Sequence, residues 1–507
     1  MQKILLALDI GTTAIKAGCF TPSGDILGIA YVEYPLIQPA RWHVEQDANQ
    51  WWELSRLAIR QALAQGDVDP TAVAAIGISA QGIACVPVDE RGQPLYNAFS
   101  WLDTRAMDQV QELSAFFSSP ADAFRRVGLH LMPAYTLPKI MWLRDHHPNV
   151  FEETAHFSTS LDFINKRLVD RFITDHSIAG GTLAHNLASL SWDSAILEAM
   201  GVPQAKLPAI GWSGTSLGRL RPHAAAQLEL PNNVEVILGG HDQEVAALGA
   251  GLRQDEVTIS LGTASILVAP LDKPVFDPEL RIPCYPHVER GQFVFEAVVN
   301  TAGVSFQWLR DLFNSISRDG AASYDYELLT ALAGEVPVGA NGVFFYPHLT
   351  GATSPFWNPH ASGVLYGLSL ASGRDEIIRA VLEGWCFQLK SNLDTIEELT
   401  SPRENAIIFG GGARSPFIQQ LLANVLNRPI IVSPTSETAL LGASMLAGLG
   451  CGIYDDLEEA KTIVRQGAQV VSPQPPAARD YDELFQSYRE FEDHLLDGSK
   501  GEEKGWQ

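Results

Sequence analysis

Short apolar runs that end at glycine or small polar residues predict most of the strands in this chain. In the first part of the chain the predicted strands are Ile4 to Leu8, Ala14 to Thr21, Asp25 to Tyr34 and Val73 to Ile78. Pro22-Ser23-Gly24 is a turn signal between two of them. Apolar residues recur among polar neighbours from Trp51 to Gln65, which indicates a helix. Strands combined with helices in this order predict a layered α/β fold.

The same succession of elements recurs in the second half. Its predicted strands are Val257 to Leu261, Ser265 to Ala269, Gln292 to Val298 and Ala406 to Phe409. Helices are predicted over Gly303 to Phe313 and Pro416 to Leu426. An Ala-rich helix, Val245 to Leu252, leads into a boundary near Gly251 to Asp255. We therefore predict domains over residues 1–250 and 251–496. The second ends in a charged amphipathic helix, Tyr481 to Leu496, and we expect the tail 497–507 to be disordered.

Length and composition agree with two large domains. The chain has 507 residues, too many for one hydrophobic core, and 46% of them are hydrophobic. The 59 acidic residues outnumber the 35 basic ones, and the net charge of -24 opposes nonspecific binding to nucleic acid or anionic membrane. The 5 cysteines are scattered singly, which indicates neither a zinc site nor a disulfide framework. No secretory signal or membrane span is visible, so we expect a cytoplasmic protein.

Two strand ends have the composition of a phosphate-binding turn. The first delivers Asp9 into Ile10-Gly11-Thr12-Thr13, and the second delivers Gly262-Thr263. A chain that turns through glycine and small hydroxyl residues can direct backbone N–H groups and hydroxyls at an anion. Lys16 adds a positive charge, and the Asp9 carboxylate can hold a hydrated Mg²⁺. Either turn alone is better interpreted as an ordinary hairpin turn, but their recurrence in two halves favours a nucleotide phosphate chain clamped by two lobes.

Two further glycine-rich segments carry chemistry. Gly410-Gly411-Gly412-Ala413 follows a strand, where backbone without side chains lets a flat base lie close; a tight strand-to-helix turn is the alternative. Gly239-Gly240-His241-Asp242 precedes a helix. Asp242 there is either a helix N-cap or a general base that accepts a proton from an attacking hydroxyl, and the two roles are compatible.

Taken together, these segments resemble the FGGY carbohydrate kinases over nearly the whole chain. Lys139-Ile140-Met141-Trp142-Leu143-Arg144-Asp145-His146 is similar to the first family signature, although Ala134 stands where an aromatic or small polar residue is usual. The stretch from Gly363 to Leu368, running on to Ala380-Val381-Leu382-Glu383, is similar to the second. The resemblance implies two duplicated ribonuclease H-like domains of the actin/Hsp70/hexokinase type, with an active-site cleft between the domains.

The resemblance also implies roles for individual residues. Asp9, Thr12, Thr13 and Lys16 match the first phosphate motif, with Asp9 holding Mg²⁺ through water, and Thr263 matches the second. Gly303 and Gln307 match a nucleotide-contacting helix start, and Gly411 and Gly412 match the adenosine motif. Asp242 falls on the family's catalytic base, with Gln243 beside it.

The sugar-reading segment departs from the named branches of the family. After Gln81 the chain has Gly82-Ile83, where xylulose kinases typically have Met-His and glycerol kinases Arg-Glu. Trp101 and Asp103 lie on the next substrate-facing segment, and Trp101 is alternatively a core aromatic residue. The predicted substrate-binding set is Gln81, Gly82, Trp101, Asp103, Asp242 and Gln243.

We therefore expect an ATP- and Mg²⁺-dependent kinase that phosphorylates a terminal hydroxyl of a small sugar or polyol. A pentulose such as xylulose, or a related sugar, is the expected substrate. The competing hypothesis is an actin-like or Hsp70-like ATPase that acts on a protein partner. No nucleic acid or membrane partner is expected, and a homodimer stays open.

Overall fold

The computed structural model describes residues 3–316 and 323–499, which form two compact units. Unit 1 comprises the chain up to Gly251 together with Leu271–Val294 and Glu437–Gln466. Unit 2 comprises Leu252–Pro270, Phe295–Ser436 and the chain from Gly467 onward. The chain therefore passes from one unit to the other five times. The first passage, after Gly251, lies at the predicted boundary, and the other four lie further along the chain. From residue 500 on, the predicted tail 497–507 lies outside the described residues.

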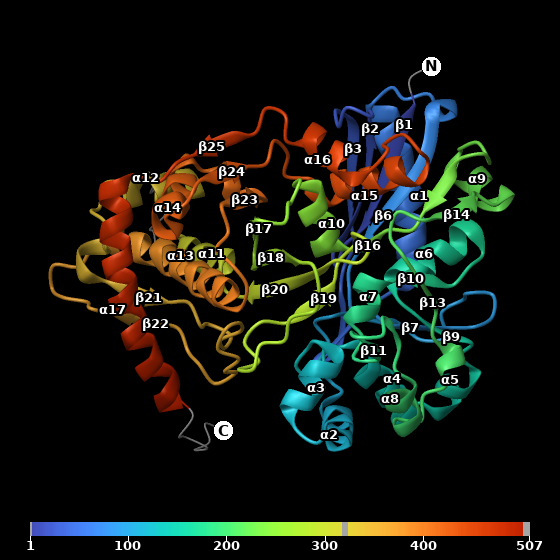
Figure 1. The fold of residues 1–507 in the computed structure, drawn as a ribbon, viewed down its shortest axis with the longest axis horizontal. Coiled ribbons are helices and arrows are strands. Elements are labelled where there is room, and N and C mark those ends of the chain that lie inside the picture. Colours follow the sequence, from blue (N-terminus) through green and yellow to red (C-terminus); the bar gives the residue numbers. More distant parts are fainter. Residues whose placement is uncertain (1–2, 317–322, 500–507) are drawn as a thin grey trace. The chain divides into compact units, whose positions relative to one another are not determined.

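Unit 1 is built on a mixed sheet with the strand order β14-β15-β6-β1-β2-β3, and β16 also pairs with β6. These strands are β1 (Ile4–Ile10), β2 (Ala14–Phe20), β3 (Ile26–Glu33), β6 (Val73–Ala80), β14 (Ser216–Arg219), β15 (Glu235–Ile237) and β16 (Gly240–His241). β1 runs antiparallel to β2 and parallel to β6 (Figure 1). Every residue of β1 is buried, as expected of a central strand that is covered on both faces.

Unit 2 repeats this order with its own strands. The full strand order of this sheet is β19-β20-β18-β17-β23-β24-β25. It contains β17 (Glu256–Leu261), β18 (Ser265–Leu271), β20 (Phe293–Val299), β23 (Asn405–Phe409), β24 (Ile430–Val432) and β25 (Gln469–Val471), with the short β19 (Cys284–Pro286) at its edge. β17 is antiparallel to β18 and parallel to β23, as β1 is to β2 and β6. Each unit therefore has a central strand that opens into a hairpin on one side and pairs in parallel on the other.

Helices cover both faces of the unit 1 sheet, and β1 distributes its side chains between them. Leu6 and Leu8 belong to the core that contains α1 (Ala48–Gln65), whereas Leu5 and Ala7 belong to the core that contains α15 (Thr438–Gly450). This alternation follows from the two-residue period of a strand. α10 (Asp242–Gly249) packs against α15.

Glycines let α10, α15 and the sheet approach closely. A Cβ at Gly249 would lie 1.9 Å from the carbonyl oxygen of Thr438, and one at Gly442 would lie 1.9 Å from that of Val245. A Cβ at Gly77 on β6 would lie 1.9 Å from the carbonyl oxygen of Ala443. The helix that begins at Asp242 is thus seated on α15, which is seated on the central sheet.

Unit 1 also contains smaller elements around this frame. The helices are α2 (Met107–Phe116), α3 (Pro120–Val127), α4 (Thr136–His146), α5 (Pro148–Glu153), α6 (Ser160–Val169), α7 (His176–Gly180), α8 (Ser194–Ala199), α9 (Pro222–Leu228) and α16 (Leu457–Val464). The short strands are β4 (Ile37–Ala40), β5 (His43–Gln46), β7 (Val86–Val88), β8 (Ala98–Phe99), β9 (His156–Ser158), β10 (Ile173–Asp175), β11 (His185–Asn186), β12 (Ser191–Trp192), β13 (Ala209–Gly211) and β19 (Cys284–Pro286).

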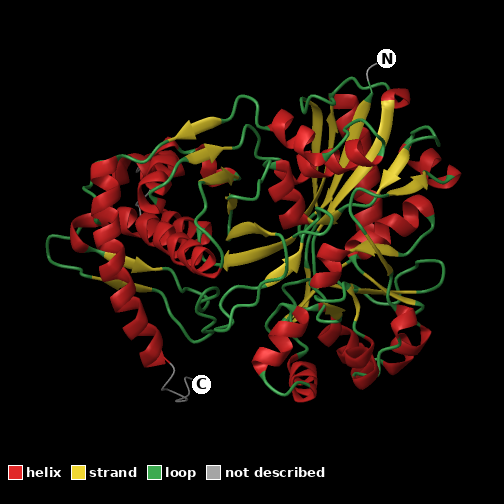
Figure 2. Cartoon of the chain, viewed as in Figure 1, coloured by secondary structure: helices red, strands yellow, loops and turns green. Residues whose placement is uncertain are grey.

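Unit 2 contains five α-helices among the described residues (Figure 2). These are α11 (Gly303–Ile316), α12 (Tyr326–Gly334), α13 (Arg374–Leu399), α14 (Pro416–Leu426) and α17 (Pro475–Ser499), with the hairpin β21 (Phe344–Tyr346) and β22 (Val364–Tyr366). Of these helices, α13 with 26 residues and α17 with 25 are longer than any in unit 1. Buried polar contacts anchor α17: the Tyr481 hydroxyl donates to Glu383 at 2.7 Å, and Gln388 Nε2 donates to the Tyr488 hydroxyl at 2.9 Å.

The predicted elements are present, with boundaries displaced by a few residues. α1 begins at Ala48 because the Asp47 carboxylate caps it and accepts from the Asn49 N–H at 2.9 Å. α10 begins at Asp242 and ends at Gly249, and α17 begins at Pro475. In the part of the chain that the structure describes, no helix is both long and apolar enough to cross a membrane.

Candidate active site

The turn between β1 and β2 places a buried carboxylate beside a lysine. Asp9 is opposite Lys16 in the antiparallel register and opposite Ser79 in the parallel one. The Ser79 hydroxyl donates to Asp9 Oδ1 at 2.8 Å, and the Gly11 N–H closes the turn onto the carbonyl of Ala14 at 3.0 Å. Thr12 and Thr13 form the tip of the turn, where Thr13 is exposed.

Several charged groups near this turn act on the pKa of Asp9. Burial raises the pKa of Asp9 from its ordinary 3.8 to about 6, the negative charge of Asp242 adds to that rise, and Lys16 opposes it. Lys16 Nζ also forms an ion pair with Glu437 at 2.9 Å. The site therefore holds an excess of acidic groups over bases close to the first phosphate turn.

A buried polar network supports the turn from behind. Gln46 Nε2 donates to the Thr12 carbonyl at 2.6 Å, and the Tyr34 hydroxyl donates to the Gly11 carbonyl at 2.5 Å. Gln81, which is buried, donates through Nε2 to Gln46 Oε1 at 3.1 Å. Gln46 and Tyr34 were not predicted from the sequence. For Gln46 the sequence offered a weak signal, a polar residue at the end of a short strand-like segment that follows the first hairpin.

Trp101 lies on the surface of unit 1 and contacts the first turn. Its indole is 42% exposed, and Nε1 donates to the Thr12 hydroxyl at 2.8 Å. The alternative that Trp101 is a core aromatic residue is therefore wrong. Asp103, by contrast, is fully buried; its carboxylate accepts from Arg105 Nε at 2.9 Å and from the Val44 N–H at 2.7 Å.

Asp242 lies at the start of α10, but it does not cap the helix. The N-cap is His241, and among the described residues no side chain forms a capping hydrogen bond to α10. Asp242 is the first helical residue, and its side chain is 27% exposed. Gln243 Nε2 donates to Asp242 Oδ1 at 3.4 Å. The N-cap interpretation is therefore wrong, since a carboxylate already inside the helical turn is not in the position from which a cap accepts.

Burial raises the pKa of Asp242, and its neighbours act in opposite directions. The positive form of His241 lowers this pKa and the charge of Glu244 raises it. The strand register explains the placement: Gly240 and His241 of β16 pair with Ser79 and Ala80 of β6, next to Asp9 and Ile10 of β1. Asp242 follows directly, so the carboxylates of Asp9 and Asp242 lie at the carboxyl ends of β1 and β16, strands that both pair with β6.

The predicted nucleotide residues of unit 2 line a single pocket of about 740 Å³. Thr263, Gly303, Gln307, Gly411 and Gly412 all contribute to its wall. The remainder includes the aromatic residues Phe306, Tyr326, Trp385 and Phe417, which were not predicted from the sequence. Phe306 and Tyr326 lie with their ring centroids 5.3 Å apart. Such a wall suits a flat, partly apolar ligand.

Glycines determine the shape of this pocket. A Cβ at Gly303 would lie 2.1 Å from the Gly262 carbonyl oxygen, and the adjacent Val304 N–H donates to the Thr263 carbonyl at 3.0 Å. A Cβ at Gly412 would lie 3.0 Å from Leu261 Cβ and 3.2 Å from the Trp385 ring. The second turn and the start of α11 are thus in backbone contact, which no other residue type at position 303 would permit.

The chain matches known proteins over almost its whole length. Residues 4–249 match the N-terminal domain of the FGGY family of carbohydrate kinases, and residues 257–451 match its C-terminal domain. The chain belongs to the FGGY family of carbohydrate kinases. Its reaction is therefore phosphoryl transfer from ATP to the hydroxyl of a sugar or polyol, and the predicted family and fold class are confirmed.

Several FGGY kinases with different names resemble this chain to similar degrees. It is 27% identical to a xylulose kinase of Bacillus subtilis, with 98% of each chain covered. It is 30% identical to a glycerol kinase of Thermococcus onnurineus, over 91% of this chain and 92% of that one. The crystal structure of a gluconate kinase from Lactobacillus acidophilus superposes with a TM-score of 0.90 at 26% identity, covering 98% of this chain and 99% of the other.

Proposed function

We propose that this FGGY kinase phosphorylates a terminal hydroxyl of a small sugar or polyol, with a pentulose such as xylulose or a related sugar as the expected substrate and Asp242 as the general base. One observation carries the assignment of the base. Asp242 is a partly exposed carboxylate at the start of a helix, and capping does not occupy it. The similarity to a xylulose kinase, a glycerol kinase and a gluconate kinase over nearly the whole chain supports a small sugar or polyol as the substrate class.

The proposed reaction requires one proton acceptor and one stabilised leaving group. The sugar hydroxyl gives its proton to an Asp242 carboxylate oxygen while its oxygen forms the bond to the γ-phosphorus. The bond from that phosphorus to the bridging oxygen breaks, and its electron pair leaves with ADP. Because burial raises the pKa of Asp242, the carboxylate is a stronger base than an exposed aspartate.

Asp9 is the proposed Mg²⁺-binding residue, and its environment suits a hard cation. Its carboxylate is buried and faces the negative charge of Asp242, with Lys16 as the nearest compensating charge. An additional positive ion would relieve this repulsion, and carboxylate oxygen is a preferred ligand of Mg²⁺. When bound, the ion would offset the negative charge of the phosphates.

The unit 2 pocket is the proposed adenosine site. Gly411 and Gly412 leave backbone exposed to the base, Gly303 and Gln307 contribute the start of α11, and Thr263 directs a hydroxyl toward the outer phosphates. Thr12, Thr13 and Lys16 of the first turn are proposed to contact the phosphates as well. Since Lys16 pairs with Glu437, its charge is held in place rather than free to rotate.

The proposed sugar contacts come from unit 1. Trp101 offers an exposed ring, and Gln243 offers an amide next to the base. The side chains of Gln81 and Asp103 are already engaged by Gln46 and Arg105, so we propose that they shape the sugar-binding segments from within. Gly82 contributes backbone alone.

Two measurements test this proposal. A panel of ketoses, aldoses and polyols should release ADP fastest with one ketose, and turnover should remain low without sugar. ATP hydrolysis that no sugar stimulates would instead favour the ATPase hypothesis. In Asp242→Asn, kcat for that ketose should fall by about 10²- to 10⁴-fold, because the amide cannot accept the proton. ATP affinity and thermal stability should be retained, and near-normal turnover would remove Asp242 as the base.

A further inference from the structure

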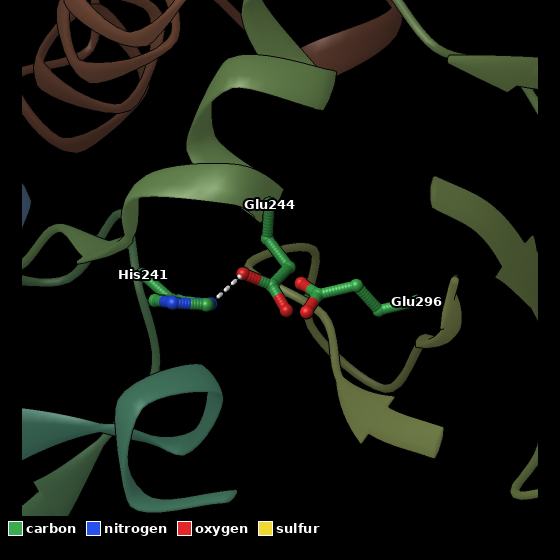
Figure 3. Close-up of side chains that lie close together, drawn as sticks. All are labelled: His241, Glu244 and Glu296. Atoms are coloured by element: carbon green, nitrogen blue, oxygen red, sulfur yellow. Dashed lines mark hydrogen bonds and ion pairs between the residues drawn. The ribbon is translucent and has the colours of Figure 1, made fainter. Parts of the chain in front are cut away.

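His241 lies between two carboxylates. Its Nδ1 lies 2.5 Å from Glu244 Oε2, the contact drawn in Figure 3, and its Nε2 lies 3.3 Å from Asp242 Oδ1. The short contact with the Glu244 carboxylate assigns a proton to Nδ1, since a carboxylate can only accept. In the doubly protonated imidazolium the opposite nitrogen, Nε2, carries a proton as well, and this N–H faces the proposed base.

The imidazole is fixed from several directions. The backbone N–H of His241 donates to the Ser177 hydroxyl at 2.9 Å, and the imidazole ring stacks on Tyr285 with centroids 6.3 Å apart. On another side the ring lies against Gly82, where a Cβ would come within 2.4 Å of both Nε2 and Cδ2. Any residue other than glycine at position 82 would therefore displace the ring from Asp242.

We propose that His241 is a positioning residue for catalysis, whose imidazole holds the Asp242 carboxylate in the orientation that accepts the proton, and that Gly82 is needed to leave the ring its place. This inference rests on the proposed role of Asp242 as the base. It gives a physical reason for the unusual Gly82: the space of a side chain there is taken by the histidine that precedes the base.

The charges around Asp242 determine the direction in which loss of the His241 imidazole shifts the pKa of Asp242. The negative charges of Glu244 on α10 and Asp9 on β1 act on Asp242. Asp9 is in turn influenced by Lys16 on β2 and by Glu437, the residue before α15. Asp175 on β10 accepts from the Ser177 hydroxyl that holds the His241 main chain. A positive His241 lowers the pKa of Asp242 against these acids. Loss of the imidazole should raise that pKa and move the acid limb of the pH profile of kcat to higher pH.

Two substitutions at position 241 separate positioning from packing. In His241→Gln the side-chain amide can reach the position of Nε2, whereas in His241→Asn it reaches only that of Nδ1. We expect His241→Asn to lose about 10²-fold in kcat, with the KM for ATP unchanged, because a small displacement of a catalytic group is costly. His241→Gln should keep most of kcat, since it can still hold Asp242. Both should move the acid limb upward by about one pH unit.

Gly82→Ala tests the same ring without removing a titratable group. It should shift the acid limb in the same direction and lower kcat by about 10-fold. Gly181→Ala is the matched control, since its Cβ would meet Ile83 at an ordinary 3.4 Å. His348→Gln is the control for loss of a buried histidine, because His348 pairs with the buried Glu492 in unit 2 at 3.1 Å. Neither control should move the acid limb.

The outcomes distinguish this inference from the proposed function. If Asp242→Asn is inactive while both His241 variants keep the wild-type acid limb and kcat, only the inference fails. Equal losses in the Asn and Gln variants, accompanied by a lower Tm, would reduce His241 to a packing residue. If Asp242→Asn retains near-normal turnover, the base itself is wrong. Should His241→Asn fail to fold, the acid limbs of His241→Gln and Gly82→Ala decide the question.

Discussion

The two units build their turns from the same strand pattern but fill them with different chemistry. In unit 1, β1 delivers Asp9 two residues before Gly11; in unit 2, β17 delivers Ser260 two residues before Gly262. Asp9 is a buried charge among other charges, whereas the Ser260 hydroxyl accepts from the Ile266 N–H at 3.0 Å and completes its own hairpin. The first turn therefore has a charged side chain at its base, whereas the second has a neutral hydroxyl there and relies on backbone contacts.

This difference separates two kinds of sensitivity. The unit 1 site should respond to the removal of charge, because its acids act on one another through low-dielectric surroundings. The unit 2 pocket should respond to added volume, because glycine backbone is in direct contact with neighbouring backbone. Substitutions that add volume in unit 2 or remove a charge in unit 1 test this comparison.

The largest effect is expected from adding a single methyl group in unit 2. Gly303→Ala places a Cβ 2.1 Å from the Gly262 carbonyl oxygen, so α11 must move away from the second turn. Nucleotide affinity should fall by about 100-fold for ATP, ADP and AMP alike, as measured by calorimetry. Gly334→Ala at the end of α12 is the control, since its Cβ would lie 3.8 Å from the Phe417 ring, and it should lose much less. Equal losses in both variants would contradict the backbone contact.

Removing the buried charge of unit 1 should stabilise the protein. The pKa of Asp9 is raised from 3.8 to about 6, so its contribution to stability is most favourable below pH 3.8 and is lost as the pH rises through 6. Asp9→Asn should therefore increase the free energy of unfolding at pH 8 by about 1–3 kcal/mol. The gain should shrink at pH 5, and activity should be lost.

Urea unfolding at the two pH values measures this change. The exposed Asp108 of α2 supplies the control, and Asp108→Asn should change stability by less than about 0.5 kcal/mol at either pH. If Asp9→Asn proved less stable than the wild type at pH 8, the attraction of Asp9 to the charge of Lys16 and its hydrogen bond from Ser79 would outweigh the cost of its burial.

The smallest of these effects concerns a single hydroxyl. Thr263→Val keeps the shape of the side chain and removes a hydrogen-bonding group that we propose faces the outer phosphates. ATP affinity should fall by about 10-fold and AMP affinity much less. Comparable losses for the two nucleotides would place Thr263 elsewhere in the pocket.

Local signals carried most of the sequence prediction. The strand ends at Asp9 and Thr263 and the glycines at 411 and 412 could be recognised because small residues directly after an apolar run predict a turn from local chain chemistry. Gly303 was recognised only through the resemblance to the family. The aromatic wall of the pocket could not, since Phe306 and Trp385 have the same appearance in a sequence whether they line a pocket or fill a core. His241 was seen only as the neighbour of Asp242, because its contact with Gly82 joins segments far apart in the chain.

Long-range assembly was the other limit. The ion pair of Lys16 with Glu437 joins residues 421 positions apart. The helix Thr438–Gly450 was not among the predicted elements, and periodicity alone would not say which sheet it covers. Backbone contacts at Gly77 and Gly249 assign it to unit 1.

The return of the chain to unit 1 has a consequence for dividing this protein into parts. A fragment that ends at Gly251 would contain the sheet and α10 but not α15, which supplies Leu440, Leu441, Met445 and Leu446 to one of the two cores. Such a fragment would expose apolar surface along Leu5 and Ala7, and it would stay soluble only if α15 were supplied as a separate segment. The gene therefore divides poorly at its sequence midpoint, and a split reporter or domain swap made from it needs residues 437–466 to accompany the first half.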